Sequence, residues 1–294
     1  MKARWLIGFC LTVWALPRAA SGQRFEEVGS NLSLRVRLVE VHAAVLDVRG
    51  RYLSGLRADQ FRVMEDGRPQ SVQIFEAQSS ALTLALLVDT TGSMVKVLPH
   101  IKNAVAQMIS AMKPEDTLGL FSFRDRLTAL QPFTHDHQSV LKALLATRAA
   151  GSTALFDSLT QLAAELSRTN GKKAILLFTD GDDNSSQLSM EQALQIVKRH
   201  GFPIYAVSQG PALENKALLK RLQELSEFTA GMSFEVRTPD QIGRAFNRIG
   251  EDLQHLYLLA YYPSQQENPH WRKIEVTIPD QKGTRIRSKE GYLP

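Results

Sequence analysis

The feature that most constrains the fold of this chain is an apolar run that ends abruptly in small polar residues, LTLALLVDTTGSM at residues 82–94. Residues 82–88 contain only one polar side chain, which suits a strand covered on both faces within a parallel sheet. Apolar residues then recur at helical spacing from Leu98 to Met112, with Pro99 in the first turn. Asp89 is therefore expected at the carboxyl end of a central strand, where open α/β sheets bind ligands.

The turn after this strand carries side chains that suit a metal ion. Asp89, Thr91 and Ser93 alternate along the turn, so one carboxylate and two hydroxyls can face a common point. Small oxygen ligands of low total charge suit Mg²⁺ or Mn²⁺ better than zinc, which prefers cysteine and histidine. Serine and threonine also cap helices, and from this stretch alone a capping role explains the pattern equally well.

Two later segments favour the metal site. Thr153 precedes a second helical pattern, and residues 174–179 form another buried-strand run that ends in Asp180. A hydroxyl at a helix start and a carboxylate at a strand end can both reach the same edge of a parallel sheet. We therefore predict a single site composed of Asp89, Thr91, Ser93, Thr153 and Asp180.

These five residues, in this order, resemble the metal-ion-dependent adhesion site of the von Willebrand factor type A domains, written DxSxS with a distant Thr and a distant Asp. Thr91 stands at the central serine, which keeps the hydroxyl and adds a methyl group. The resemblance covers about residues 82–252. It implies that Thr91 and Ser93 bind the cation directly, whereas Asp89 and Asp180 often act through water. We expect Mg²⁺, with Mn²⁺ or Ca²⁺ as alternatives, and a protein partner that supplies an Asp or Glu to the metal.

The segments on either side of this region have the pattern of antiparallel strands. Residues 31–80 alternate apolar and polar side chains, and Asp66-Gly67 is a strong hairpin signal between the apolar pairs Phe61/Val63 and Val72/Ile74. Three further strand-like runs cover residues 256–262, 273–278 and 284–288. Because neither set alone buries a large apolar face, we predict that the two ends form one β-sandwich.

Strand and helix patterns alternate between these ends, which is typical of a doubly wound parallel sheet. The predicted fold class is therefore α/β, with this sheet inserted into the β-sandwich. The predicted parts are a signal peptide (1–22), the two portions of the sandwich (23–80 and 254–294) and a von Willebrand factor type A domain (81–253). Segments such as LDVRGRYLSGL and LAYYP resemble secreted bacterial proteins, common in acidobacteria, that contain a related domain.

Two other segments have some features of metal sites. Asp180, Asp182, Asn184 and Glu191 fall at positions 1, 3, 5 and 12 of a calcium loop, but position 6 is a serine where the sharp turn needs glycine. The sequence His135-Asp136-His137 contains two ligand types, yet no third ligand lies nearby in the sequence. A solvated acidic loop and a helix cap explain these segments as well.

A phosphoryl-transfer enzyme is the alternative to a binding function. The letters DTTGSM also resemble the DKTGT motif of haloacid dehalogenase-type enzymes, in which Asp89 would be the nucleophile beside Mg²⁺. Thr90 stands where those enzymes have lysine, and residues 179–184 read TDGDDN where they have GDGxND. An aspartic protease fits less well, because DTTGS has one residue too many and occurs once. We therefore predict a metal-dependent protein-binding module and not an enzyme.

The charge of the chain does not indicate a nucleic-acid partner. The formal net charge is +5, but three positive charges lie in the first 22 residues, and without them it is +2. The sequence has no cluster of lysine and arginine with interleaved aromatic residues. The sole cysteine, Cys10, also lies in this first segment, so the remaining chain would not rely on disulfides, which suits a bacterial envelope protein.

The first 22 residues predict export from the cytoplasm to the periplasm or the exterior. Lys2 and Arg4 precede an apolar run at residues 5–16, and small residues follow at 19–22. This is the three-part pattern of a secretory signal peptide, and its apolar run is too short for a comfortable membrane span. We expect cleavage between about Ala20 and Arg24, which mass spectrometry of the mature N-terminus checks. A cytosolic product that retains residues 1–20 would contradict the prediction.

Overall fold

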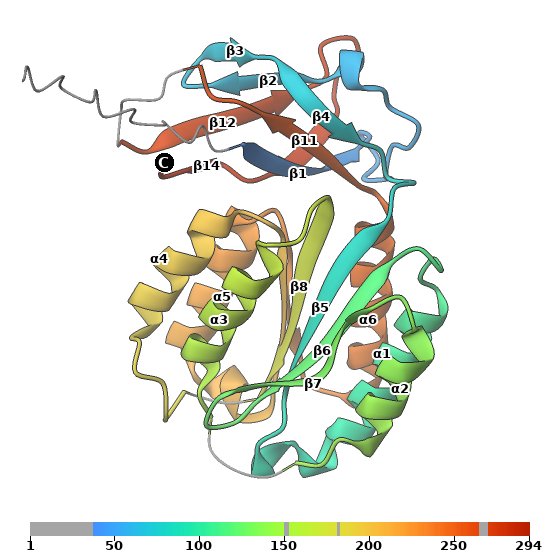
Figure 1. Ribbon diagram of the computed structural model, residues 1–294, viewed down its shortest axis with the longest axis vertical. Helices are drawn as coiled ribbons and strands as arrows, with labels where there is room; N and C mark the ends of the chain where they lie inside the picture. The colour runs from blue at the N-terminus through green and yellow to red at the C-terminus, as the bar shows by residue number, and fades with distance from the viewer. Residues whose placement is uncertain (1–37, 150–152, 181–182, 265–269) are drawn as a thin grey trace, which may run out of the picture. The chain divides into compact units, whose positions relative to one another are not determined.

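A computed structural model describes residues 38–149, 153–180, 183–264 and 270–294; the predicted signal peptide lies outside this part. The central element is a six-stranded sheet with the strand order β10-β9-β8-β5-β6-β7 (Figure 1). Only the pairing of β6 with β7 is antiparallel in this sheet. Its strands are β5 (Leu82–Asp89), β6 (Thr117–Phe123), β7 (Leu127–Thr134), β8 (Lys172–Thr179), β9 (Ile204–Gln209) and β10 (Ser233–Val236).

Six α-helices cover the two faces of this sheet (Figure 1). One face carries α1 (Leu98–Ser110), α2 (His137–Ala146) and α6 (Pro239–Gln254). The other carries α3 (Leu155–Leu166), α4 (Met190–His200) and α5 (Lys216–Phe228).

The alternation of side chains along β5 explains its apolar run. Leu84 and Leu86 belong to the core beneath α1 and α6, whereas Ala85 and Leu87 belong to the core beneath α3 and α4. Successive side chains of a strand point to opposite faces, so a strand covered on both faces needs apolar residues throughout. The predicted doubly wound α/β fold is therefore confirmed.

Two smaller antiparallel sheets combine strands from both ends of the described chain. Their strand orders are β13-β1-β11-β4 and β14-β12-β2-β3. Apolar residues of both sheets, among them Val41, Val63, Leu259 and Val276, form one shared core. The strands are β1 (Val39–Leu46), β2 (Arg62–Glu65), β3 (Arg68–Gln70), β4 (Val72–Glu76), β11 (Leu256–Tyr261), β12 (Arg272–Thr277), β13 (Arg285–Ser288) and β14 (Gly291–Tyr292). We call this unit the sandwich.

The hairpin at Asp66-Gly67 forms, but its second arm is not the predicted one. β2 pairs with β3, and both turn residues have positive φ, 49° for Asp66 and 75° for Gly67. β4, which contains Val72 and Ile74, instead crosses to the other sheet and pairs with β11. β3 has the sequence RPQ and is mostly exposed, so it lacks the alternating apolar residues that identify a strand in sequence.

Short 3₁₀ segments complete the described part of the chain: η1 (Ala58–Gln60), η2 (Gly92–Lys96) and η3 (Gly210–Glu214). The last two follow the carboxyl ends of β5 and β9 and shorten the path from strand to helix. Among the helices of the described residues, none has the length and apolar character needed to cross a membrane.

The end of α6 is fixed by a buried carboxylate, Asp252. Its oxygens accept hydrogen bonds from the Tyr52 hydroxyl at 2.5 Å, from the Tyr205 hydroxyl and from the Arg287 guanidinium. Tyr52 follows β1 and Arg287 lies in β13, so this carboxylate ties the last helix to the sandwich. Burial and the nearby Asp252 charge raise the pKa of both tyrosines, which keeps their hydroxyls protonated as donors.

We predict that Asp252→Ala destabilises the protein strongly. The change leaves a largely buried guanidinium and two tyrosine hydroxyls without their acceptor, which costs about 3–5 kcal/mol of unfolding free energy. Glu251→Ala is the matched control, because the adjacent Glu251 forms an exposed ion pair with Arg248 whose loss costs less than about 1 kcal/mol. Urea unfolding of both variants tests the prediction, and equal losses would contradict it.

Candidate metal centre

The carboxyl end of β5 brings three of the predicted residues together. Asp89 is the last residue of the strand and is fully buried. One of its carboxylate oxygens, Oδ1, accepts hydrogen bonds from the Thr91 backbone N–H at 2.9 Å and from the Thr91 hydroxyl at 2.7 Å. η2 begins at the next residue and places the Ser93 hydroxyl 3.0 Å from that of Thr91.

The neighbouring strand β8 adds a fourth predicted residue, Asp180. β8 pairs in parallel with β5 and ends at Thr179, so Asp180 reaches the same edge of the sheet as Asp89. The Ser93 hydroxyl donates to Asp180 Oδ1 at 3.0 Å. The Thr179 hydroxyl, which the sequence analysis did not single out, donates to the other oxygen of Asp89 at 3.4 Å.

Thr153, the fifth predicted residue, is buried just before α3 and is held through its backbone. Its N–H donates to the Asn184 side-chain oxygen at 2.9 Å, and its carbonyl accepts from the N–H groups of Asn184 and Ser185. These bonds tie Thr153 to the loop that follows Asp180. Among the described residues, no hydrogen bond joins the Thr153 hydroxyl to the other four predicted ligands.

The Thr91 and Ser93 hydroxyl oxygens converge to 3.0 Å at the end of β5. Each hydroxyl has one hydrogen: Thr91 can donate its hydrogen to Asp89, and Ser93 can donate its hydrogen to Asp180. Either hydroxyl can donate across the 3.0 Å contact between the two oxygens, so the three contacts share two hydrogens. Octahedral Mg²⁺ with bonds of about 2.1 Å has adjacent ligands about 3.0 Å apart, so this spacing fits two neighbouring ligands of such a cation.

The charges of the site also fit a divalent cation. Burial raises the pKa of Asp89 despite its hydrogen bonds from Thr91. Burial, together with the Asp89 charge, raises the pKa of Asp180 to about 6. Neither carboxylate forms an ion pair with a lysine or arginine of the described chain. Two carboxylates thus lie close together without a counter-charge, and a bound cation would supply it.

Of the suggested calcium-loop ligands, Asp182 lies outside the described residues, whereas Asn184 and Glu191 have other partners. Asp183 accepts hydrogen bonds from the backbone N–H groups of Phe156 and Ser186, both at 2.8 Å. Glu191 lies in the first turn of α4 and pairs with Arg221 at 3.5 Å. Asp183 and Asn184 therefore support the loop around Thr153, a role that sequence reasoning missed because it depends on contacts between distant segments.

The His135-Asp136-His137 segment is a helix cap. Asp136 accepts hydrogen bonds from two N–H groups in the first turn of α2, and both histidine rings lie within hydrogen-bonding distance of the Asp116 carbonyl. No group of three or more His, Cys, Asp or Glu side chains suited to a metal occurs in the described ranges. The candidate centre itself has two carboxylates and takes its other oxygens from hydroxyls.

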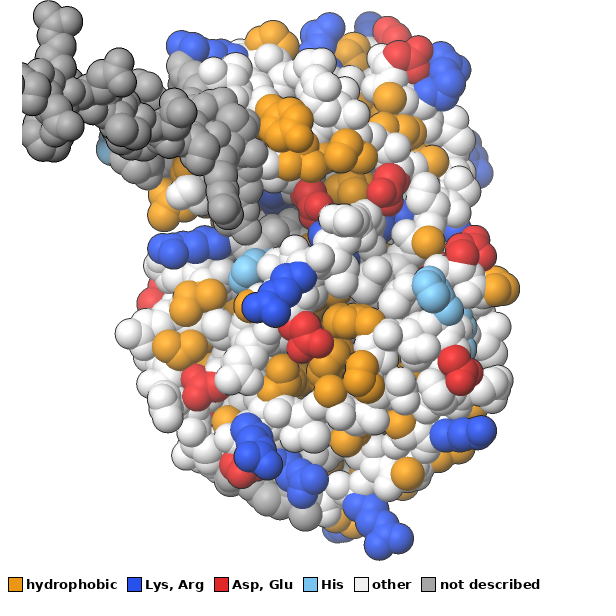
Figure 2. Space-filling model, in the orientation of Figure 1, with side chains coloured by type: hydrophobic (Ala, Val, Ile, Leu, Met, Phe, Trp, Pro, Cys, Tyr) orange, Lys and Arg blue, Asp and Glu red, His pale blue; other side chains and the backbone are white. Residues whose placement is uncertain are grey.

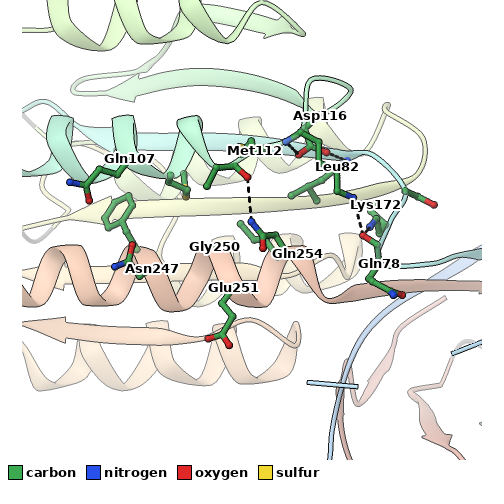
Figure 3. Close-up of a pocket in the computed structure, with 16 residues that line it drawn as sticks. Gln78, Leu82, Gln107, Met112, Asp116, Lys172, Asn247, Gly250, Glu251 and Gln254 are labelled. Carbon is green, nitrogen blue, oxygen red and sulfur yellow. Dashed lines mark hydrogen bonds between the residues drawn. The ribbon is translucent and has the colours of Figure 1, made fainter. Parts of the chain in front are cut away.

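A cavity of about 240 Å³ lies between α1 and α6, near the start of β5 (Figure 3). The Asp116 carboxylate accepts from the N–H groups of Leu82 and Lys113, and the Lys172 ammonium donates to the Gln78 carbonyl. Burial lowers the pKa of Lys172 to about 8. These groups fix the start of β5 and β8, at the opposite edge of the sheet from Asp89 and Asp180.

Comparisons with known proteins agree with this fold. Residues 84–182 match the family model of the von Willebrand factor type A domain, and this range includes all five predicted ligands. No curated protein sequence matches the chain.

Among solved structures, a von Willebrand factor type A protein from Catenulispora acidiphila is similar with a TM-score of 0.53 and 12% identity, over 88% of this chain and 74% of that one. Proximal thread matrix protein 1 from the mussel byssus, with a zinc-occupied MIDAS motif, is similar with a TM-score of 0.52 and 16% identity, over 64% of this chain and 49% of that one. At these identities the likeness shows a shared fold. Together with the family match, it establishes that this chain contains a von Willebrand factor type A domain.

The raised pKa of Asp180 predicts an unusual pH dependence of the metal-free protein. Because this pKa lies above that of the unfolded chain, the folded state binds more protons between about pH 4 and pH 6. Stability is therefore lost as the pH rises through this window, by at most about 2–3 kcal/mol, which solvent screening of the carboxylate reduces. Asp180→Asn should reduce this loss to the part that the buried Asp89 contributes, whereas Asp125→Asn, at an exposed site, should retain all of it.

Urea unfolding at pH 4, 5, 6 and 7 in the presence of a chelator measures the effect. Mg²⁺ added at pH 7 should restore the lost stability in the wild type and not in Asp180→Asn. If the unfolding free energy of the wild type changed with pH in the same way as that of Asp180→Asn across this range, the prediction would be contradicted.

Proposed function

We propose that this protein is a metal-dependent protein-binding module whose divalent cation is held by Asp89, Thr91, Ser93, Thr153 and Asp180. The convergence of the Thr91 and Ser93 hydroxyl oxygens between the carboxylates of Asp89 and Asp180 carries the proposal. The membership of this segment in the von Willebrand factor type A family supports it.

The proposed residues divide into ligands and groups that orient them. Asp89 and Asp180 orient the two hydroxyls by accepting their hydrogens, which leaves lone pairs free to bind a cation. Thr91 is buried and Ser93 is exposed, so the site opens to the surface on the Ser93 side. When bound, the cation supplies residual positive charge and an open coordination position, which a carboxylate of the partner would fill.

Mg²⁺ is the proposed cation, with Mn²⁺ and Ca²⁺ as alternatives. The ligand set contains oxygen atoms and no sulfur or imidazole, which suits hard cations. The mussel byssus protein shows that zinc can occupy a MIDAS motif in a protein with this fold. A direct competition between these four cations would rank them for the present site.

The structure favours binding over phosphoryl transfer by Asp89. A nucleophilic carboxylate must present an oxygen to its substrate, but Asp89 has no exposed surface and both its oxygens accept hydrogen bonds. Of the five proposed residues, Ser93 is the exposed one. We therefore propose a binding protein and retain the haloacid dehalogenase-type reaction as the outcome that would displace it.

We also propose that the module acts outside the cytoplasm, after removal of the signal peptide at residues 1–22. In this proposal residues 81–253 form the von Willebrand factor type A domain, and residues 23–80 and 254–294 form the sandwich that carries it. The partner is a protein and not a nucleic acid, because the exported chain has a formal charge of only +2. No stable membrane span is expected in the exported chain.

Two adjacent buried threonines provide a matched test of the metal site. Thr91→Val replaces a hydroxyl by a methyl group at a proposed ligand and should weaken Mn²⁺ binding by at least about tenfold, the loss expected for a ligand or its close support. Thr90→Val makes the same change at a hydroxyl that has no hydrogen-bond partner among the described residues, so Mn²⁺ affinity should be unchanged. Calorimetric titration of both variants measures the difference, and equal affinities would overturn the assignment of Thr91.

Thr153 separates the binding function from the enzymatic alternative. Thr153→Ala should weaken Mn²⁺ or Mg²⁺ binding. Its cost in stability should be small, because Ala154 is the N-cap of α3 and the first N–H groups of this helix donate to Asp183 and Ser186. The wild type should release no phosphate from phosphate esters and form no phosphoaspartate. Unchanged metal affinity in Thr153→Ala, together with phosphate release that depends on Asp89, would favour the enzyme.

A further inference from the structure

The turn between β6 and β7 lies directly beside the candidate metal centre. β6 pairs in parallel with β5, and its last residue, Phe123, is in register with Asp89. The Phe123 carbonyl accepts a hydrogen bond from Thr90 N–H at 3.4 Å, and the Arg124 carbonyl accepts one from Ala154 N–H. The backbone around Arg124 therefore contacts both segments that carry the proposed ligands.

This turn presents two arginines whose charges are not neutralised within the described chain. Arg124 is half-buried, Arg126 is exposed, and the Arg124 N–H donates to the Arg126 carbonyl at 3.4 Å, which closes the turn. Neither guanidinium pairs with a carboxylate of the described residues. Figure 2 shows basic side chains gathered in the lower part of this face, where Figure 1 places the β6–β7 turn.

The other charged groups of the described chain at this edge have both signs. Lys96, at the end of η2, is a third exposed cation. Among the described residues, the acids at this edge outside the candidate centre are the exposed Asp125, within the same turn, the exposed Glu214, at the end of η3, and the half-buried Asp183, in the loop after β8. A guanidinium offers two parallel N–H groups that match the two oxygens of a carboxylate, so the arginines are suited to bind an anionic group of a partner.

We propose that Arg124 and Arg126 bind a second carboxylate of the partner that gives its first carboxylate to the cation. This inference rests on the proposed function. It narrows the partner from any protein with an accessible Asp or Glu to an acidic segment that carries two carboxylates. It also makes the two arginines determinants of specificity, because they contact the partner and take no part in holding the metal.

Small carboxylates can test this proposal without knowledge of the natural partner. The probes are dicarboxylates from succinate to suberate, each compared with the monocarboxylate of the same chain length. Their binding displaces water from the metal of the Mn²⁺-loaded protein. Water proton relaxation measures this displacement. At least one dicarboxylate should bind about fivefold more tightly than its monocarboxylate, as expected for an additional exposed ion pair. This preference should decrease as the salt concentration rises.

The double variant Arg124→Gln/Arg126→Gln should bind Mn²⁺ as tightly as the wild type and lose the preference for dicarboxylates. Arg62→Gln/Arg199→Gln is the control, because it removes two exposed arginines of β2 and α4 and changes the net charge equally. The arginine Nε–H resonances of the protein loaded with diamagnetic Mg²⁺ provide a second readout. Those of Arg124 and Arg126 should shift on addition of the dicarboxylate and not on addition of the monocarboxylate.

The outcomes distinguish this inference from the proposed function. If the wild type binds Mn²⁺ but shows no preference for any dicarboxylate, or if the double variant keeps the preference, Arg124 and Arg126 do not read a second carboxylate. If the wild type fails to bind Mn²⁺, the proposed function itself is wrong and this inference falls with it.

Discussion

The burial of β5 on both of its faces is the constraint on which the rest of this structure depends. Leu84 and Leu86 pack into one core and Ala85 and Leu87 into the other, so the strand must lie in the middle of the sheet with helices on either side. The first polar residue after this run, Asp89, then falls at the sheet edge, beside the end of the parallel strand β8. The same apolar run that stabilises the domain therefore determines where its polar residues gather.

The candidate site illustrates how a functional arrangement opposes stability. Burial raises the pKa of both Asp89 and Asp180, which means that their charged forms are unfavourable in the folded protein without a cation. An alternative sequence with one carboxylate, or with a lysine nearby, would relieve this repulsion. Such a change would also remove the oxygen ligands or occupy the position of a cation. Clusters of this kind are typical of sites retained for binding or catalysis and not for stability.

Much of this arrangement could be predicted from the sequence, because the relevant signals are local. The strand before Asp89, the strand before Asp180 and the helix after Thr153 all have continuous or periodic apolar patterns, and their ends meet at one edge of the sheet. The second arm of the hairpin could not be predicted, because β3 is short, exposed and without apolar alternation. The support of Thr153 by Asn184 was also missed, since it depends on contacts between loops distant in sequence.

The pairing of β4 with β11 determines how force would pass through this molecule. β4 leads into the von Willebrand factor type A domain and β11 leads out of it, and the two strands are antiparallel neighbours within one sheet. A pull on the domain by a bound partner therefore loads both strands at their domain-proximal ends and in the same direction. Little shear arises between β4 and β11, and the load passes to the pairing of β11 with β1. The sandwich would accordingly resist tension as one body. Its weakest point would be the pairing of β11 with β1, which separates β4 and β11 from the rest of that sheet.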